Sequence, residues 1–148
     1  MPGQSSLPKH TGIFFNGSFI EGDTRLQSRN PATGEEILEV NGASPIMVDQ
    51  IVEHASRAQL GWWNLDIRER VACVRNFIHQ IEAHGEELAM LDAIDSGNPY
   101  KGMLIDIKIS LAVMDLFAGL ATEIKGASFP GSSERINFSV CEPLGVVT

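Results

Sequence analysis

The sequence DSGNPY at residues 95–100 marks a sharp turn between two helical segments. Glycine and proline this close together end helices, because glycine adopts left-handed backbone and proline lacks an amide donor. The preceding segment, Glu86–Asp95, carries acids in its first turn, where the helix dipole favours them. The following segment, about Lys101–Lys125, is apolar on most of its circumference, and Gly126 would end it. We therefore predict two helices joined by this turn, the second packed on several sides.

Two further helices are predicted upstream of this pair. Ser44 can cap a helix that has Pro45 at its first position, and apolar residues follow at helical spacing. Asp66 and Glu69 have the spacing of a capping box at the start of a second helix. Gly85 can end that second helix in the left-handed conformation.

Short strands are expected before these helices. Residues 13–15 and 19–20 flank Asn16-Gly17-Ser18, and Asn-Gly tolerates the positive φ of a tight hairpin turn. A second turn, NPATG at residues 30–34, precedes a short apolar strand at residues 37–40.

The last part of the chain predicts a loop followed by extended structure. Residues 128–133 are typical of a loop, being rich in serine, proline and glycine. Apolar and polar residues then alternate, which predicts a half-buried strand from Arg135 to Glu142. Pro143 interrupts it, and residues 144–148 begin another extended element that has no continuation.

The composition is that of an acidic globular protein. The 148 residues include 11 Lys and Arg against 19 Asp and Glu, which gives a net charge of −8. With 43% hydrophobic residues the chain is not disordered as a whole. The acidic balance argues against a nucleic-acid partner, because phosphate recognition needs clustered Lys and Arg.

The most hydrophobic stretch, Met103 to Ile124, has the length of a membrane span. It contains Asp106, Lys108 and Asp115, and each central charge would cost about 2.5–3.5 kcal/mol on insertion. We expect a buried helix and no membrane partner. Met1 to His10 has no apolar core of a secretory signal, so a cytoplasmic location is expected.

Two residue pairs allow a functional and a structural interpretation. Asp92 and Asp95 are three residues apart on one helix and could be paired carboxylates, although a solvated face favoured by the helix dipole is the alternative. Trp62 and Trp63 could form a stacking platform, whereas at the end of an amphipathic helix Trp62 is more often part of the core.

No catalytic or cofactor-binding residue is predicted from the residues themselves. Glycine-rich phosphate loops are absent from the sequence. Cys73 and Cys141 lie far apart, form no CxxC pair, and are expected to be inert thiols in a reducing compartment. No nucleophile and base stand at a recognisable spacing.

Five motifs, in this order, carry a resemblance. They are FNGSFI at 15–20, NPATGE at 30–35, DSGNPY at 95–100, FAG at 117–119 and EPLGVV at 142–147. Together they resemble the start of the NAD(P)-dependent aldehyde dehydrogenase superfamily, from about Ile13 to Thr148. The implied fold class is α/β, here mainly helical with short hairpins, before the Rossmann-like sheet is completed.

The resemblance implies a fragment covering roughly the first third of such an enzyme. In that family a cysteine nucleophile, a glutamate base, an oxyanion-holding asparagine and the dinucleotide-binding strands follow the EPLGVV motif. Cys73 and Cys141 match no nucleophile position, and Glu142 is not the base. We therefore expect no catalytic or NAD(P)-binding residue in this chain, and no activity from the chain alone.

The resemblance also divides the chain and implies its partners. Residues 1–12 would be a mobile leader, residues 13–134 the N-terminal part of the cofactor-binding domain, residues 135–143 an oligomerisation-flap strand and residues 144–148 the truncated start of the next strand. The flap implies self-association or pairing with a full-length aldehyde dehydrogenase subunit. The alternative function is a non-catalytic interaction module that pairs through this strand.

Two minor sites follow from the resemblance. A structural monovalent cation would lie between Asp95 and backbone carbonyls of Ser28 and Arg29, because an oxygen cage suits a hard cation. The alternative is that Asp95 is only a helix-end hydrogen-bond acceptor.

The fourth helix would line the substrate tunnel, with two isoleucines along the tunnel and an acid at the mouth of the tunnel. Core packing is the alternative for the isoleucines. These residues are Ile105, Ile109 and Asp106.

Too many apolar residues on the fourth helix need cover. Three preceding helices and two short hairpins cannot bury all of its faces, so we expect part of this surface to stay exposed. The residues concerned are Leu104, Ile107, Leu111, Met114, Phe117 and Leu120.

Overall fold

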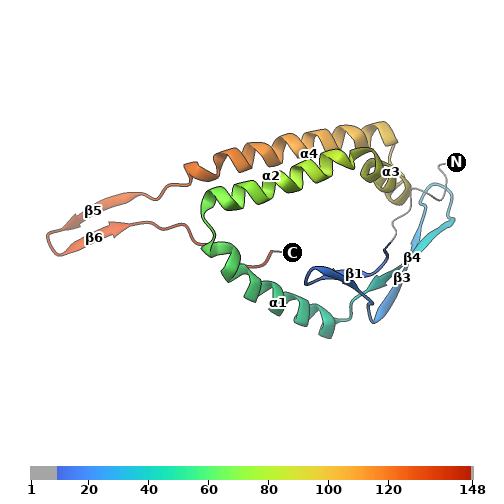
Figure 1. The fold of residues 1–148 in the computed structure, drawn as a ribbon, viewed down its shortest axis with the longest axis horizontal. Helices are drawn as coiled ribbons and strands as arrows, with labels where there is room; N and C mark the ends of the chain where they lie inside the picture. The colour runs from blue at the N-terminus through green and yellow to red at the C-terminus, as the bar shows by residue number, and fades with distance from the viewer. Residues whose placement is uncertain (1–9, 148) are drawn as a thin grey trace.

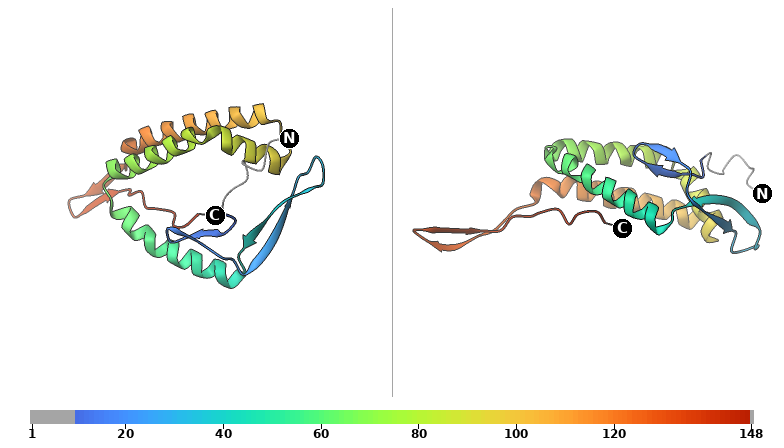
Figure 2. Two further views of the ribbon diagram at one scale, coloured as in Figure 1. Left: turned by 45° about the vertical axis from the view of Figure 1, so that its right-hand side comes forward. Right: turned by 90° about the horizontal axis from the view of Figure 1, so that it is seen from below.

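The computed structural model describes residues 10–147. Within them, four helices and three two-stranded antiparallel hairpins form an open frame, with α1 on one side and α2, α3 and α4 on the other (Figures 1 and 2). This mainly helical mixture confirms the predicted fold class, while most of the expected leader, residues 1–12, lies outside the described residues. The elements are β1 (Ile13–Phe15), β2 (Ser18–Ile20), β3 (Thr24–Arg29), β4 (Glu36–Gly42), α1 (Pro45–Asn64), α2 (Ile67–Ala83), α3 (Gly85–Ser96), α4 (Tyr100–Leu120), the 3-10 turn η2 (Ala121–Glu123), β5 (Ser128–Ser132) and β6 (Arg135–Phe138).

The first hairpin confirms the prediction made for its turn. Asn16 and Gly17 have φ angles of 48° and 81°, the positive values that a two-residue turn requires. The ring of Phe15 packs edge-on against His54 of α1, with ring centroids 5.0 Å apart. The hairpin is therefore attached to the first helix.

The second hairpin contains a strand that the sequence pattern does not predict. β4 extends the strand predicted at residues 37–40, and it pairs along its length with β3. The sequence of β3, TRLQSR, has a single apolar residue and no alternation, so only pairing with β4 makes it a strand. The predicted turn between them is confirmed, because Asn30 Oδ1 accepts hydrogen bonds from the amides of Ala32 (2.9 Å) and Thr33 (3.3 Å).

Both predicted helix starts are confirmed. Ser44 Oγ accepts a hydrogen bond of 3.4 Å from the amide of Met47, and Pro45 stands in the first turn of α1. Asp66 and Glu69 form a reciprocal capping box at the start of α2. Local polar groups thus fix where each helix begins.

Asp23 ties the turn before β3 to the start of α1. Its carboxylate accepts a hydrogen bond from the side chain of Ser44 and another, of 2.6 Å, from the amide of Ser44. These bonds hold the pKa of Asp23 below its ordinary value. The contact therefore stabilises the fold above the ordinary Asp pKa of about 3.9, and this stabilisation is lost as the pH falls through the lowered pKa.

Replacing the donor should raise that pKa. We expect Ser44→Ala to move the protonation midpoint of Asp23 upward, measured by NMR titration of its carboxyl carbon. Ser56→Ala is the matched control, because it removes a hydroxyl from the same helix that bonds only the carbonyl of Val52. Identical Asp23 midpoints in the parent and Ser44→Ala would contradict the assignment.

The predicted end of the second helix at Gly85 is wrong. α2 ends at Ala83, His84 has a φ of −110°, and Gly85 is the first residue of α3. Gly85 lies beside α4, where a Cβ would be in van der Waals contact with Cγ2 of Ile107, 3.4 Å away. The left-handed glycine that ends a helix is Gly97, with a φ of 74° after α3, as the DSGNPY turn predicts.

The helix α4 packs along α2 and α3 and ends at Leu120, before the predicted Lys125. The turn η2 takes up part of the difference. The core between these helices is thin, and no large side chain of residues 10–147 is fully enclosed. The buried apolar residues within that range are Ile78, Ala89, Met103 and Ala118.

Much apolar surface remains uncovered, as expected. Of the six α4 residues predicted to need cover, Phe117 and Leu120 are 66% and 47% exposed, and the others are half-buried. The expectation that Trp62 belongs to the core is wrong, because it is 42% exposed at the end of α1. Nothing among residues 10–147 covers these side chains.

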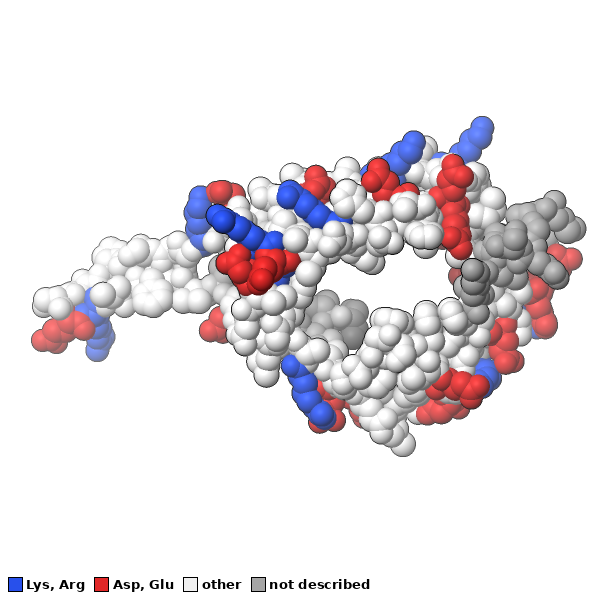
Figure 3. Space-filling view, viewed as in Figure 1, with Lys and Arg blue, Asp and Glu red and all other residues white. Residues whose placement is uncertain are grey.

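The third hairpin corrects three predictions. Residues 128–133 were expected to be a loop, but β5 occupies most of them and pairs with β6. The strand expected at residues 135–142 ends at Phe138 and is exposed rather than half-buried, because no second layer covers it. No strand is assigned at residues 144–147. The hairpin projects from the frame, and charged side chains appear mainly at its tip (Figures 1 and 3).

The described helices include none suited to a bilayer. No helix among residues 10–147 combines the length and apolarity that crossing a membrane requires. The most apolar of these helices is α4, and the charges of Asp106, Lys108 and Asp115 make it unsuitable for crossing a membrane.

Candidate functional site

The strand β3 and the last turn of α3 meet at two residues predicted to share a site. Ser28 Oγ donates a hydrogen bond of 2.6 Å to Asp95 Oδ1, although 67 residues separate them in the sequence. Asp95 is exposed, and a pocket of about 320 Å³ between β4 and α3 opens beside it. The structure therefore brings Ser28 and Asp95 together.

Two turn motifs build this corner. The glycine of DSGNPY, Gly97, lies so close to the NPATG turn that a Cβ on it would be 2.8 Å from Cγ of Pro31. A side chain at Gly97 would therefore clash as well as strain the left-handed backbone. The two motifs are distant in sequence but in contact in the fold, and this contact positions Asp95 against β3.

The third residue expected at this site, Arg29, was expected to contribute only its backbone carbonyl. Its guanidinium forms an ion pair of 2.7 Å with Glu36 across the hairpin, and this pair leaves the expectation for the carbonyl untested. Residues 10–147 contain no group of three or more His, Cys, Asp or Glu that could hold a metal ion. The oxygens in place here are one carboxylate and one hydroxyl, which are hard ligands suited to a monovalent cation.

The residues expected along a substrate tunnel lie on an uncovered side of α4. Ile105 and Ile109 are 58% and 56% exposed, one helical turn apart, and Asp106 beside them is also exposed. Nothing among residues 10–147 buries the two isoleucines, so the choice between a tunnel lining and core packing stays a prediction. They form an open apolar face with an acid at its side.

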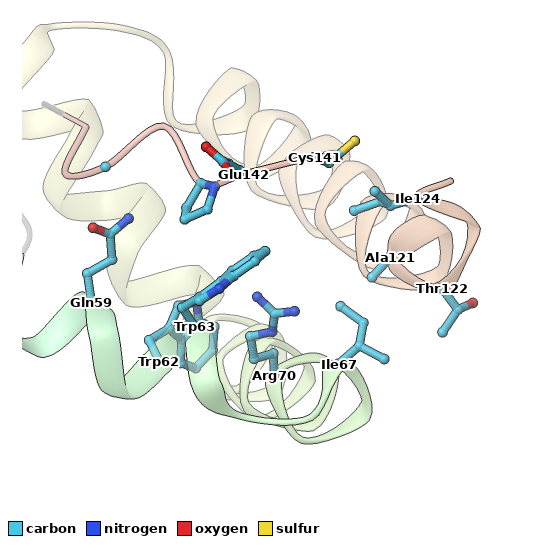
Figure 4. Close-up of a pocket in the computed structure, with 12 residues that line it drawn as sticks. Gln59, Trp62, Trp63, Ile67, Arg70, Ala121, Thr122, Ile124, Cys141 and Glu142 are labelled. Atoms are coloured by element: carbon cyan, nitrogen blue, oxygen red, sulfur yellow. The ribbon is translucent and has the colours of Figure 1, made fainter. Parts of the chain in front are cut away.

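A larger pocket lies between the end of α1, the start of α2 and the segment after the third hairpin. Its volume is about 690 Å³, and its lining is mostly apolar (Figure 4). The residues that line it include Trp62, Trp63, Ile67, Arg70 and Glu142.

Arg70 is the residue of this pocket that the sequence did not indicate. Its guanidinium lies 5.0 Å from the ring centroid of Trp63, a cation–π contact across the α1–α2 turn. The only signal in the sequence is an arginine seven residues after a tryptophan. The two residues lie on different helices, α1 and α2, so their spacing along the chain does not predict a contact. Periodicity within one helix cannot predict a contact made around a turn.

The two cysteines are free, exposed thiols. Cys73 lies on α2, and Cys141 lies beside the larger pocket, after the third hairpin. Cys141 lies in no helix or strand, and the structure keeps the two thiols on separate segments.

Comparison with known proteins identifies the chain's relatives. Residues 19–148 match the family model described as "Aldehyde dehydrogenase family". The aldehyde dehydrogenase tropH of Talaromyces stipitatus is 33% identical over 151 residues, which cover 99% of this chain and 29% of the relative. A betaine aldehyde dehydrogenase of Cereibacter sphaeroides is 33% identical over 117 residues, covering 78% and 24%. The chain thus spans less than a third of these relatives.

Solved structures agree with this relation. A putative aldehyde dehydrogenase from Burkholderia cenocepacia matches with a TM-score of 0.80 and 27% identity, covering 86% of this chain and 27% of that chain. The structure of PnpE in complex with nicotinamide adenine dinucleotide matches with a TM-score of 0.80, 26% identity and the same coverage. The resemblance drawn from five short motifs is therefore confirmed over nearly the whole chain. The chain belongs to the aldehyde dehydrogenase family.

Proposed function

We propose that this chain is the N-terminal part of an enzyme that oxidises aldehydes to carboxylic acids with NAD(P)+. The observation that carries the proposal is coverage: 99% of the chain aligns with 29% of an aldehyde dehydrogenase. Its role would be to supply a frame of helices and hairpins on which the rest of the enzyme packs. The exposed apolar faces of α1 and α4 support this role.

Catalysis and cofactor binding would belong to the rest of such an enzyme. PnpE, a relative by structure, was solved with NAD bound, which supports NAD(P) as the cofactor of the whole. We assign no catalytic or NAD(P)-binding residue to this chain. The test compares NAD(P)H formation by the chain alone with that by the chain supplied with the part of a relative that the alignment does not cover.

A second function is favoured by the third hairpin. Ile136 and Phe138 of β6 are 85% and 65% exposed on a hairpin that projects from the frame, and both its strands have a free edge. Such a hairpin could pair with a second copy or with a full-length aldehyde dehydrogenase subunit, making the chain a non-catalytic interaction module. This alternative predicts binding to an intact relative, whereas the leading proposal predicts binding to a relative that lacks the matching region.

We further propose a cytoplasmic location and a structural cation beside Asp95. The two free cysteines, Cys73 and Cys141, support a reducing compartment. The oxygens of Ser28 and Asp95 support a K+ or Na+ ion held together with nearby backbone carbonyls, those of Ser28 and Arg29 being the candidates.

The cation proposal predicts a difference between two neighbouring acids. With the chain fused to the uncovered part of the Talaromyces relative, Asp95→Ala should abolish the gain in melting temperature when KCl or NaCl replaces choline chloride. Asp92→Ala is the matched control, because Asp92 lines the same pocket but does not bond Ser28. If Asp95→Ala and the parent respond to salt equally, Asp95 is only a hydrogen-bond acceptor.

A further inference from the structure

Arg70 has an unsatisfied donor in the larger pocket. Its Nε atom is buried and has no hydrogen-bond partner among residues 10–147. A buried donor without an acceptor loses its bond to water and gains nothing in return, so native structures rarely leave one unpaired. The position calls for an acceptor that residues 10–147 do not supply.

The guanidinium is held in place and directed into the pocket. Trp63 lies under it, with the ring centroid 5.0 Å from Cζ, and Ile67 flanks it on the same helix (Figure 4). Glu142 lines the same pocket, yet no ion pair between it and Arg70 is formed within the described range. A fixed guanidinium with a free Nε can donate two parallel hydrogen bonds, one from Nε and one from an Nη. The two oxygens of a carboxylate can accept both bonds at once.

The size of the pocket indicates a polypeptide segment rather than a single ion. The pocket is open to solvent, and its volume of about 690 Å³ is large enough to take several side chains of an added segment. The lining is mostly apolar, with two tryptophans, and its charged side chains are Arg70 and Glu142. Tryptophan and arginine are enriched among the residues that dominate binding at protein interfaces. One cation in an apolar pocket is complementary to one acid carried on an apolar segment.

We infer that Arg70 is the anchor of an internal docking site, where an Asp or Glu carboxylate on a segment of the remaining aldehyde dehydrogenase polypeptide binds its Nε and one Nη. This inference rests on the proposed function, because that remaining polypeptide is the occupant. The indole rings of Trp62 and Trp63 would cover the apolar flanks of the same segment. Arg70 is thus a structural anchor and has no part in the chemistry.

The two tryptophans make the site measurable. They are the only tryptophans of the chain, and both line the pocket. The chain would be labelled with 5-fluorotryptophan and titrated with the unlabelled part of the Talaromyces relative that the alignment does not cover. We expect both fluorine resonances to shift on binding, and their shifts give the dissociation constant.

Three variants separate charge from packing. Arg70→Met should weaken binding at least about 10-fold, because it leaves the carboxylate buried and unpaired. Arg68→Met changes an exposed arginine two residues before Arg70 on the same helix, outside the pocket lining, and should bind like the parent. Arg70→Lys keeps the charge and should bind more tightly than Arg70→Met.

The outcomes are distinct. Equal affinities of the parent and Arg70→Met, or equal weakening in Arg70→Lys and Arg70→Met, would overturn the carboxylate anchor and leave the proposed function standing. If neither the parent nor any variant binds the added polypeptide, the proposed function itself fails. Far-UV circular dichroism of each free variant, matched to the parent, ensures that a loss of binding is not a loss of helix.

Discussion

The chain purified by itself should self-associate and should unfold without a sharp cooperative transition. Its helices have local start signals and should form, but the side chains that would lock them together lack partners. Among residues 10–147 no large side chain is fully enclosed, and Leu116 and Phe117 of α4 are 58% and 66% exposed. Secondary structure without fixed packing is the expected state.

The energetic argument concerns apolar area. Burial of apolar surface is worth about 25 cal/mol per Å², so leaving a few hundred Å² in water forfeits on the order of 5–10 kcal/mol. This is comparable with the whole stability of an ordinary domain, about 5–15 kcal/mol. The net charge of −8 slows association but cannot cover an apolar face.

Calorimetry and sedimentation measure both effects. We expect a broad, weak heat-absorption profile, binding of a hydrophobic dye and a sedimentation coefficient that rises with concentration. Phe117→Gln should reduce the association, whereas Leu144→Gln, which changes a residue 96% exposed beyond the third hairpin, should reduce it less. A sharp transition from a concentration-independent monomer would contradict the incomplete core.

The second expected result is a rate of NAD(P) reduction indistinguishable from background with any aldehyde. The resemblance implies a cysteine nucleophile, and we expect neither Cys73 nor Cys141 to take its place. Both thiols are exposed, and they lie on separate segments rather than at one shared site. Loss of a placed nucleophile and base removes several orders of magnitude in rate.

The assay needs a control for contaminating dehydrogenases. A Cys73→Ser and Cys141→Ser double variant, purified in the same way, should give the same background rate as the parent. Turnover in the parent that the double variant loses would mean that this chain carries its own catalytic thiol.

Local features of the fold could be predicted from the sequence. Ser44 and Asp66 start helices because their own side chains accept hydrogen bonds in the first turn, and Asn16-Gly17 turns the chain because of its backbone preferences. The resemblance placed Ser28 and Asp95 at one cation site, and the structure brings the two side chains together in a hydrogen bond. The cation itself stays a prediction.

Features that depend on distant partners could not be predicted. β3 is polar and becomes a strand only because β4 pairs with it. β5 likewise becomes a strand because it pairs with β6. Gly85 carries a helix-ending signal, yet it is the first residue of α3 and does not adopt the left-handed conformation. Trp62 and Ile136 have the patterns of buried residues but remain exposed, since nothing in residues 10–147 covers them.

The most direct test asks whether this chain restores activity to an aldehyde dehydrogenase that lacks its N-terminal part. This chain would be mixed with the part of the Cereibacter betaine aldehyde dehydrogenase that its alignment does not cover, and NADH formation from betaine aldehyde would be followed. The matching piece of the Cereibacter enzyme, added in the same way, is the positive control. We predict that the mixture forms NADH while each component alone does not. If the control restores activity and this chain neither does so nor co-sediments with the added polypeptide, the chain is not a structural part of an aldehyde dehydrogenase.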